Sequence, residues 1–410
     1  MTTISPVADR EYAQGTQRIC DPEVTLLKIT PILAQCGITR VLDITQLDRI
    51  GIPTYNAIRP NGIILSISNG KGWTNAAAAV SAIMESIEVE HSEYPLTSDW
   101  HLATSAEALR QEGHEPIDPT TLIQDCLWPN DEYGGLYYSP ELILDWVEAD
   151  ELIDANKVMI PASTIYVTPP YLQYFTSNGL ASGNSYEEAV LHAICEIVER
   201  DAIAKLMGRT KDSPPSLLRP LRLETLPGHL VDLAELVSSG GIEMFLLSMP
   251  STIDIYTFWT IFYCPGEPTF ILNTSGGYGT HTDPTIAASR ALTEAAQARL
   301  AHIHGAREDL GIDHVNRQLS ADELAQRTSL QARTFDKFRT MPSWSWEEML
   351  EAYPHHCKNL DIQGSLDRVL DMLVEAGMGK VFVHDLTKPN LDVAVTRVFI
   401  PGMKISANML

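Results

Sequence analysis

This sequence lacks the features that would direct it to a nucleic acid or a membrane. Basic residues are scarce: 29 Lys and Arg stand against 53 Asp and Glu, for a net charge of −24 over 410 residues. Non-specific DNA or RNA binding needs clustered Lys and Arg, and so does docking on an anionic membrane surface. Neither partner is expected, whereas a neutral or basic peptide is favoured electrostatically.

Long apolar runs and paired cysteines are also missing. No window approaches the roughly 20 apolar residues that a membrane helix requires, and the N-terminal MTTISPVADREY is polar, unlike a signal peptide. The six cysteines are scattered without a CxxC pair, which fits neither a zinc site nor a disulfide framework; they are Cys20, Cys36, Cys126, Cys195, Cys264 and Cys357. We therefore expect a soluble, cytoplasmic protein.

The common nucleotide-binding motifs are absent too: there is no GxxxxGK[ST] loop, no protein-kinase motif set and no clean GxGxxG. Instead, a helix pattern recurs three times with identical spacing from a capping residue to two polar acceptors. The copies are Thr74, Ala82, Glu85, Glu88; then Ser185, Ala193, Glu196, Glu199; then Asp283, Ala291, Glu294, Gln297.

Each copy follows a glycine-bearing segment that we expect to be a loop: Gly70-Lys71-Gly72, Ser182-Gly183-Asn184, and Gly276-Gly277-Tyr278-Gly279. A helix turns about 100° per residue, so the first two copies each predict one apolar face and one carboxylate face. No Lys lies on either acidic stripe, although solubility alone would favour i,i+4 Lys partners.

Each element alone has an ordinary structural explanation. Glu188 belongs to a capping box with Ser185, a single ExxE is usually a solvated face, and an isolated His192 or Cys195 is more often a packing residue. Three acid pairs at one spacing are harder to explain in this way, because converging carboxylates repel one another unless a cation lies between them. The pattern therefore favours a shared site for Mg²⁺ and a phosphorylated ligand. Positive charge for phosphates is available from Arg18, Lys71, Arg200 and Arg299.

Strands are expected at 39–44, 62–68, 242–248, 255–263, 269–273, 381–385 and 393–398, with helices from Pro22 and after each glycine segment. Residues 1–17 are predicted to form a loose arm. Strands and helices alternate irregularly, so the fold class is α+β or mixed α/β.

Four segments together resemble the YcaO-domain proteins, from about Gly15 to Arg307 and more weakly beyond. They are ITRVLDITQLDRIGIPTYNAIRPN, SISNGKGWTNAAAAVSAIMESIE, GLASGNSYEEAVLHAICEIVERDA and ALTEAAQARL. The resemblance implies a fold that binds ATP and Mg²⁺, a homodimer, and phosphorylation of a peptide backbone amide oxygen followed by its replacement by a nucleophile. The expected divisions are 1–100 (N-terminal part with the first acidic helix), 101–165 (peripheral insert), 166–305 (core with the other two helices) and 306–410 (C-terminal region).

The motif match also implies roles for individual residues. Mg²⁺ would be held by Glu85, Glu88, Glu188, Glu196 and Glu199. The nucleotide would be contacted by Arg18, Lys71, Ser81, Glu85, Asn184, Arg200, Gln297 and Arg299. No catalytic nucleophile is assigned.

The sequence departs from the family pattern in two places. Val89 follows Glu88 where many members carry Arg, so one cation is missing, and the C-terminal FIPGMKISANML lacks the Pro-x-Pro-x-Pro tail of many azoline-forming members. We also expect no N-terminal domain like the fused leader-peptide binder. The missing tail and the missing binder favour a stand-alone member that forms a thioamide with a TfuA-like partner. The alternatives are an azoline-forming cyclodehydratase acting on Cys, Ser or Thr of a precursor peptide with a leader-binding partner, a non-catalytic accessory protein, and an unrelated carboxylate-bridged metallohydrolase. A metallohydrolase of that kind is expected to have more His ligands than His192 alone.

Overall fold

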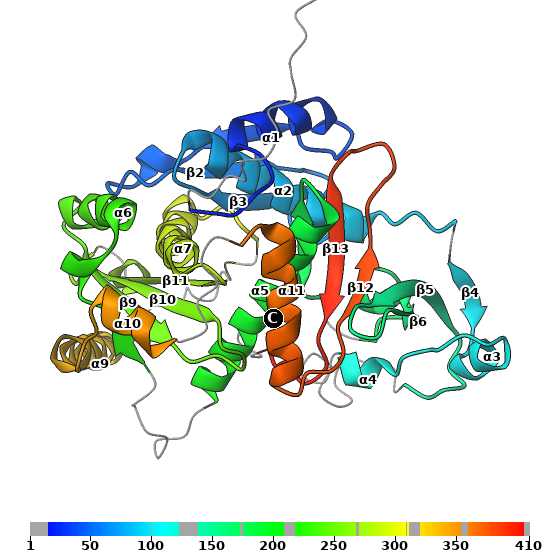
Figure 1. The fold of residues 1–410 in the computed structure, drawn as a ribbon. Coiled ribbons are helices and arrows are strands. Elements are labelled where there is room, and N and C mark those ends of the chain that lie inside the picture. Colours follow the sequence, from blue (N-terminus) through cyan, green and yellow to red (C-terminus); the bar gives the residue numbers. More distant parts are fainter. Residues whose placement is uncertain are drawn as a thin grey trace, which may run out of the picture.

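Three antiparallel sheets lie around helix α5 (Tyr186–Met207) in the computed structural model (Figure 1). The structure describes residues 15–98, 100–122, 138–172, 175–208, 218–267, 270–308, 310, 320–353 and 360–405. The first sheet has the order β1 (Arg40–Asp43), β2 (Thr54–Ile58), β3 (Ile67–Lys71). The second has the order β11 (Thr274–His281), β10 (Tyr256–Tyr263), β9 (Glu243–Met249), β8 (Arg219–Pro220).

The third sheet joins strands from both halves of the chain. Its order is β4 (His101–Thr104), β5 (Leu144–Glu151), β12 (Phe382–Asp385), β13 (Ala394–Phe399), β7 (Leu180–Gly183), with β6 (Asn156–Pro161) paired to β5. The late strands predicted from the sequence are confirmed, and they lie between strands that precede them by more than two hundred residues.

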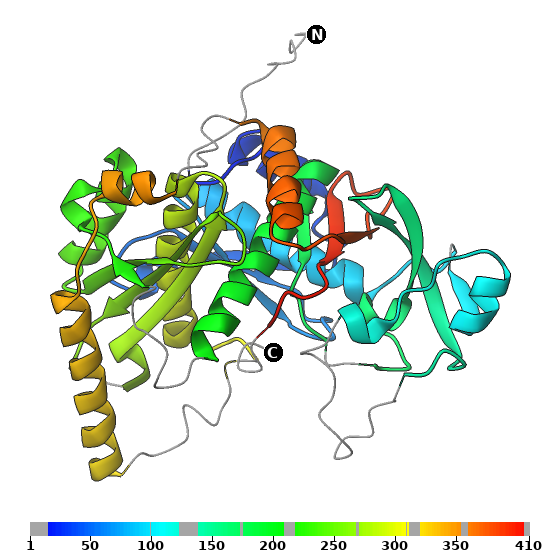
Figure 2. The ribbon, with the colours of Figure 1, turned by 60° about the horizontal axis from the view of Figure 1, so that its bottom comes forward.

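The last strand at one end of each sheet leads into a long helix. These helices are α2 (Asn75–Glu93), α5 (Tyr186–Met207) and α7 (Pro284–His304). The others in the described chain are α1 (Pro22–Ile29), α3 (Ala106–Gln111), α4 (Pro119–Leu122), α6 (Gly228–Ser239), α9 (Ala321–Thr340), α10 (Trp346–Ala352) and α11 (Ile362–Glu375). Helix α9 extends away from the body (Figure 2).

Helix α5 is held by a core on its apolar face. Val190, Ile194 and Val198 are fully buried there, against Leu366 and Val369 of α11. Burying a branched side chain of this size contributes about 1.5–3 kcal/mol. The apolar face predicted for this helix is therefore confirmed, and it leaves the opposite face free to carry carboxylates.

Two predicted strands are misplaced. The strand expected at 62–68 begins only at Ile67, because the carboxylate of Glu93 accepts the backbone N–H groups of Ile63 and Ile64 (2.9 and 2.6 Å) and holds a turn there. Residues expected as a strand at 269–273 form a 3₁₀ turn from Phe270 to Asn273, and Thr269 lies outside the described residues. The strand itself, β11, follows that turn.

The predicted loose arm and peripheral insert are more integrated than expected. Residues 1–14 lie outside the described part, but Gln17 bonds the carbonyl of Leu360 (2.9 Å) and the hydroxyl of Ser365 (3.2 Å). Within the predicted insert, β5 pairs with β12, and its Val147 lies in a core with residues of α2. Strand β4 and helix α3 lie at the outer end of the part that extends to one side (Figure 1).

None of the helices that the structure describes combines the length and apolar character of a membrane-spanning segment.

Candidate functional site

The three repeated helices begin where the sequence predicts. The side chains of Thr74 and Ser185 each accept a backbone N–H from three residues on, at 3.1 and 3.2 Å. The carboxylate of Asp283 accepts the N–H groups of Thr285 and Ile286, at 2.7 and 3.2 Å. These N-caps satisfy backbone donors that would otherwise lack partners and fix the start of each helix, so equal spacings place equivalent side chains at equivalent heights.

The glycines before these helices lie in strands, where loops were expected. Gly70 is the residue before the last of β3, Gly183 ends β7, and Gly277 lies inside β11. A Cβ on Gly70 would lie 2.1 Å from the backbone nitrogen of Ala82, and one on Gly277 would lie 2.2 Å from that of Ala295. Each strand thus touches the backbone of its own helix, so close packing accounts for these glycines.

The three strand–helix units close into a ring. Helix α2 contacts β7 of the second unit, α5 contacts β11 of the third, and α7 contacts β3 of the first. Hydrogen bonds between side chains and the neighbouring strand join two of the same helix–strand pairs. Glu88 of α2 accepts the N–H and the hydroxyl of Ser182 on β7 (2.8 and 2.5 Å), and Lys71 of β3 donates to Glu294 of α7 (2.5 Å).

Carboxylates gather inside this ring, and burial changes their acidity. Burial raises the pKa of Glu88 from 4.5 to about 8, although the bonds from Ser182 act in the opposite direction; the nearby Glu85 and Glu196 raise it further. Burial also raises the pKa of Glu199 to about 7, with Glu294 adding to the effect. The pKa of Glu196 is raised by burial as well, against the influence of Arg200. Acids from all three helices therefore act on one another.

Cations from several elements compensate only part of this charge. Arg200 lies 3.5 Å from Glu196. Burial would raise the pKa of Glu294, but Lys71 and Arg200 outweigh that effect and hold the pKa below its ordinary value. Since Glu88 and Glu199 remain poor acids despite these neighbours, the ring has the electrostatics of a site that takes a further cation.

Two buried polar atoms near the carboxylates lack partners among the described residues. They are Oε1 of Gln297 and Nε of Arg200. An unpartnered buried acceptor or donor costs about 1–3 kcal/mol, which a ligand would recover. The donor set of carboxylate and amide oxygens is the one that Mg²⁺ prefers.

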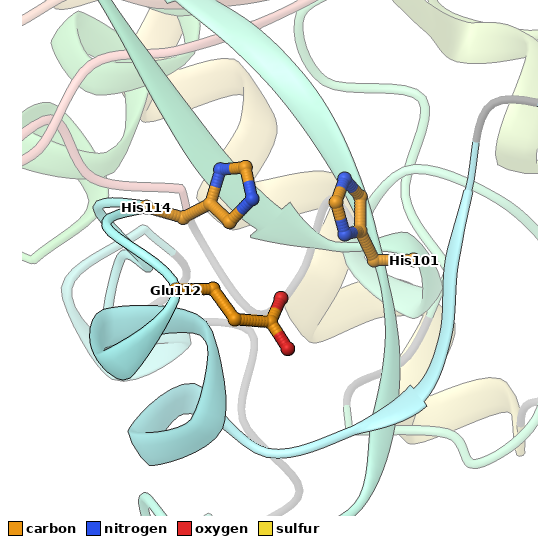
Figure 3. Close-up of side chains that lie close together, drawn as sticks. All are labelled: His101, Glu112 and His114. Atoms are coloured by element: carbon orange, nitrogen blue, oxygen red, sulfur yellow. The ribbon is translucent and has the colours of Figure 1, made fainter.

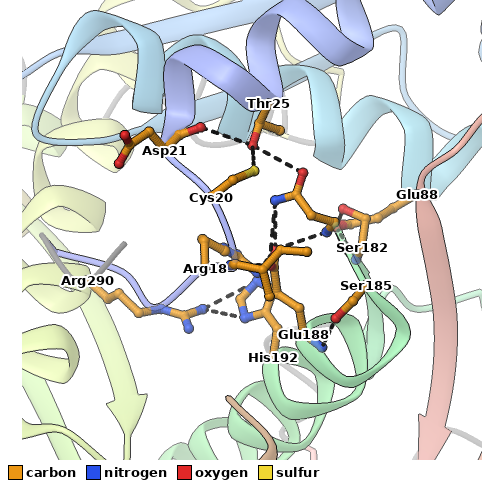
Figure 4. Close-up of polar contacts among 12 residues, drawn as sticks. Arg18, Cys20, Asp21, Thr25, Glu88, Ser182, Ser185, Glu188, His192 and Arg290 are labelled. Atoms are coloured by element: carbon orange, nitrogen blue, oxygen red, sulfur yellow. Dashed lines mark hydrogen bonds and ion pairs between the residues drawn. The ribbon is translucent and has the colours of Figure 1, made fainter. Parts of the chain in front are cut away.

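Three predicted residues, Arg18, Asn184 and Glu188, meet near the start of α5; Figure 4 labels Arg18 and Glu188. Glu188 accepts the Arg18 guanidinium (3.1 Å), the N–H of Ile19 (3.0 Å) and the N–H and side-chain amide of Asn184 (3.1 and 3.3 Å). The Asn184 oxygen in turn accepts the hydroxyl of Thr25 (3.1 Å). Glu188 therefore ties the N-terminal segment down, a task the sequence did not reveal.

Within the described chain, Arg299 forms no hydrogen bond or ion pair with the carboxylates of the ring and bonds other groups instead. Its buried guanidinium bonds Asp48 (3.0 Å), Glu267 (3.0 Å) and the carbonyl of Leu272 (2.8 Å). Glu85 lies 3.7 Å from Arg307, and Ser81 is half-buried on the same helix. The nucleotide contacts assigned to Arg299 and Ser81 stay predictions, and for Arg299 the structure shows a different task.

Sequence reasoning missed two arginines near the acids. Arg290 of α7 donates to Nδ1 of His192 on α5 (2.8 Å) and lowers the pKa of Glu199; the fully buried Arg397 of β13 lowers that of Glu196. Arg290 carried a signal, because it lies seven residues after its cap, as His192 does. Arg397 carried none, since its strand is distant in sequence.

The comparisons with known proteins decide the family. The profile of the YcaO cyclodehydratases, described as ATP- and Mg²⁺-binding, matches residues 69–404. This chain belongs to the YcaO family. An uncharacterized Mycobacterium tuberculosis protein is 36% identical over 330 residues, covering 78% of this chain and 70% of the relative. An uncharacterized protein of Rhizobium leguminosarum bv. trifolii, in the 3′ region of tfuA, is 31% identical over 404 residues, covering 95% and 89%.

A solved structure has the same fold. It is YcaO from Methanopyrus kandleri bound with AMPPCP and Mg²⁺, with a TM-score of 0.70, 23% identity, and coverage of 96% of this chain and 94% of that one. The YcaO assignment makes ATP and Mg²⁺ the cofactors of this chain, as the residues predicted. Its class is that of the ATP-dependent, cyclodehydratase-like enzymes.

Proposed function

We propose that this YcaO protein activates a backbone amide of a peptide or protein substrate and, with a TfuA-like partner, exchanges the amide oxygen for sulfur. The observation that carries the choice of sulfur is the Rhizobium relative in the tfuA region, which aligns with 95% of this chain. When bound, ATP supplies the phosphoryl group that makes a poor leaving group, the amide oxygen, a good one.

The roles proposed for individual residues follow from the ring. Glu85, Glu88, Glu196 and Glu199 hold Mg²⁺ between the helices, and Gln297 and Arg200 contact the nucleotide with their unpartnered buried atoms. Lys71 and Arg18 neutralise phosphate charge at the rim. Such a site acts mainly by positioning reactants and stabilising charge. Glu188 and Asn184 hold the N-terminal segment through Ile19 and Thr25, and Glu188 is a further proposed ligand of Mg²⁺.

The two buried thiols of the described residues favour an external source of sulfur. Burial raises the pKa of Cys195, beside Glu196 on α5, to about 12, and that of Cys36 to about 11. Thiols of this kind stay protonated at neutral pH and are inert as nucleophiles. A partner protein that delivers sulfur fits this arrangement, and we extend the proposal to a homodimer of this chain.

Azoline formation is the alternative, favoured by the cyclodehydratase description of the family. The two reactions differ in product mass, since a thioamide exchanges oxygen for sulfur whereas an azoline loses one water at a Cys, Ser or Thr.

The test compares proteins of the source cells with those of a deletion strain complemented by wild type or by Glu199→Gln, using peptide mass spectrometry. An oxygen-to-sulfur exchange present only with wild type supports thioamidation. Water loss at Cys, Ser or Thr would replace it with the azoline reaction. Identical proteomes in all strains would contradict peptide amide activation.

A further inference from the structure

A second group of metal-ligating side chains lies far from the carboxylate ring, in the part that extends to one side of the molecule. His101 begins β4, while Glu112 and His114 follow helix α3. Their ligand atoms all lie within 4.8 Å of one another. Figure 3 shows the three side chains converging on one space from these two elements.

Backbone hydrogen bonds hold the two elements that carry these residues. Helix α3 ends in a turn at Gly113 (φ +88°), where the N–H of Gly113 bonds the carbonyl of Arg110 (3.1 Å) and that of His114 bonds Leu109 (2.9 Å). The left-handed conformation favours glycine there. This turn lets Glu112 and His114, two residues apart, face the same side.

The segment beyond the turn is fixed to the third sheet. The N–H of Met159 on β6 bonds the carbonyl of Glu115 (2.8 Å), and the N–H of Ile117 bonds that of Met159 (2.9 Å). On the other side, His101 pairs with Trp146 of β5. The three side chains are thus presented by backbone whose position the sheet determines.

The two imidazoles have no hydrogen-bond or ion-pair partner among the described residues, and Glu112 likewise has none. The rings meet edge to face, with centroids 4.8 Å apart. Other histidines of the described chain are engaged: His304 lies 3.1 Å from the Asn56 amide, and His384 bonds Tyr166 and a backbone carbonyl. The nitrogens of His101 and His114 therefore remain available.

We propose that His101, Glu112 and His114 bind one divalent transition-metal ion, with Zn²⁺ as the best fit. Two imidazoles and one carboxylate are a set that Zn²⁺ accepts, with a fourth position for water, whereas Mg²⁺ prefers oxygen ligands only. Tetrahedral Zn²⁺ with bonds of 2.0–2.1 Å places ligand atoms about 3.4 Å apart. Small side-chain rotations close the present separations, and Glu112 is exposed and free to make them.

The bound ion would add a tie to edge strand β4, which side chains of β5 also hold: Asp145 accepts the N–H of Ala103 (2.8 Å) and Trp146 donates to the carbonyl of Thr104 (3.1 Å). Strand β4 pairs with β5 only at His101 and Thr104, with an irregular register between them. A metal bridge joins β4 to the end of α3 and closes the segment between them, so its effect is on the stability of this region. The site is separate in position and in chemistry from the Mg²⁺ site of the carboxylate ring.

The test uses the full chain, stripped with a chelator and titrated with Zn²⁺ in excess Mg²⁺. The variants are His101→Gln, His114→Gln and Glu112→Gln, with Glu107→Gln as control, an exposed carboxylate on α3 outside the cluster. We expect one Zn²⁺ per chain in wild type and control, and at least ~100-fold weaker binding in both His variants, more than the loss of a supporting residue causes. Amide hydrogen exchange in residues 101–114 should slow with Zn²⁺ only where binding is retained.

Two further readouts keep the result decisive. Glu112→Gln changes an exposed side chain, so it tests binding even if a His variant fails to fold. Co²⁺ in place of Zn²⁺ should give visible bands without a thiolate charge-transfer band. Failure of wild type to bind Zn²⁺, equal binding by Glu112→Gln, or a thiolate band would each overturn the proposal.

Discussion

Among single residues, Glu88 shows most directly how burial and charge shape the carboxylate ring. The charges of Glu85 and Glu196 act on its side chain, which has only the Ser182 donors as hydrogen-bond partners in the described chain. A carboxyl group in this setting keeps its proton at neutral pH unless a cation replaces that proton. Proton and Mg²⁺ therefore compete for the same oxygens.

This competition predicts a pH dependence. The folded-state pKa of Glu88, about 8, exceeds its ordinary value of 4.5, so its contribution to stability is present at low pH and is lost as pH rises towards 8. The melting temperature of the metal-free protein should fall between pH 6 and pH 8. Mg²⁺ with AMPPCP should raise that temperature more at pH 8, because binding then displaces fewer protons.

The control for this prediction is Glu88→Gln, which has no proton to release. Its melting temperature without Mg²⁺ should vary less with pH than that of wild type. An equal gain from Mg²⁺ at both pH values in wild type would contradict the competition.

At the level of elements, glycines in β3, β7 and β11 determine how closely each of these strands packs against the helix that follows it. Gly277 has no room for a methyl group, since a Cβ added there would lie 2.2 Å from the backbone nitrogen of Ala295 on α7. We predict that Gly277→Ala lowers the free energy of unfolding by about 1–3 kcal/mol or more, as overpacking does. Urea unfolding measures it.

Gly228 provides the matched control. It begins α6, has a negative φ, and no atom lies within 4 Å of an added Cβ. Gly228→Ala should change the free energy of unfolding by less than ~1 kcal/mol. Equal losses in the two variants would show that close strand–helix contact is not what Gly277 provides.

The N-terminal segment gives a second prediction for an element. Arg18 is paired with a Glu188 carboxylate that is almost fully buried. Removing a charged partner from a buried acceptor costs about 1–3 kcal/mol, so Arg18→Ala should lower the free energy of unfolding by that amount and speed amide exchange in residues 15–21. Lys28→Ala breaks a pair with the exposed Asp392 and should cost less than ~1 kcal/mol. A similar small loss for Arg18→Ala would mean that the segment is held by other contacts.

The sequence predicted elements where the signal was local. The caps Thr74, Ser185 and Asp283 lie within one turn of the groups they bind, so the helix starts could be read directly. The strands around the glycines could not, because a glycine-rich segment such as β11 has low intrinsic strand propensity. It is a strand because helix α7 and strand β10 lie against it.

At the scale of the whole molecule, three segments separated by about a hundred residues each form one ring. The repeated spacing predicted that their acids share a site, and the raised pKa values of Glu88 and Glu199 fit that prediction. The cyclic order of contacts was not predictable, because contact between one helix and another unit's strand leaves no periodic signal. The same holds for Arg397, and for the group of His101, Glu112 and His114.

The central claim is that this ring binds one Mg-nucleotide, and calorimetric titration with AMPPCP tests it most directly. Wild type should bind the nucleotide in a Mg²⁺-dependent manner, and Glu187→Gln, a change on the same helix outside the carboxylate group, should bind equally well. Glu199→Gln and Glu85→Gln should remain folded and bind at least ~10–100-fold more weakly, the loss seen even for residues that only support a metal ligand. Wild-type affinity in Glu199→Gln, or binding indifferent to Mg²⁺, would contradict the account.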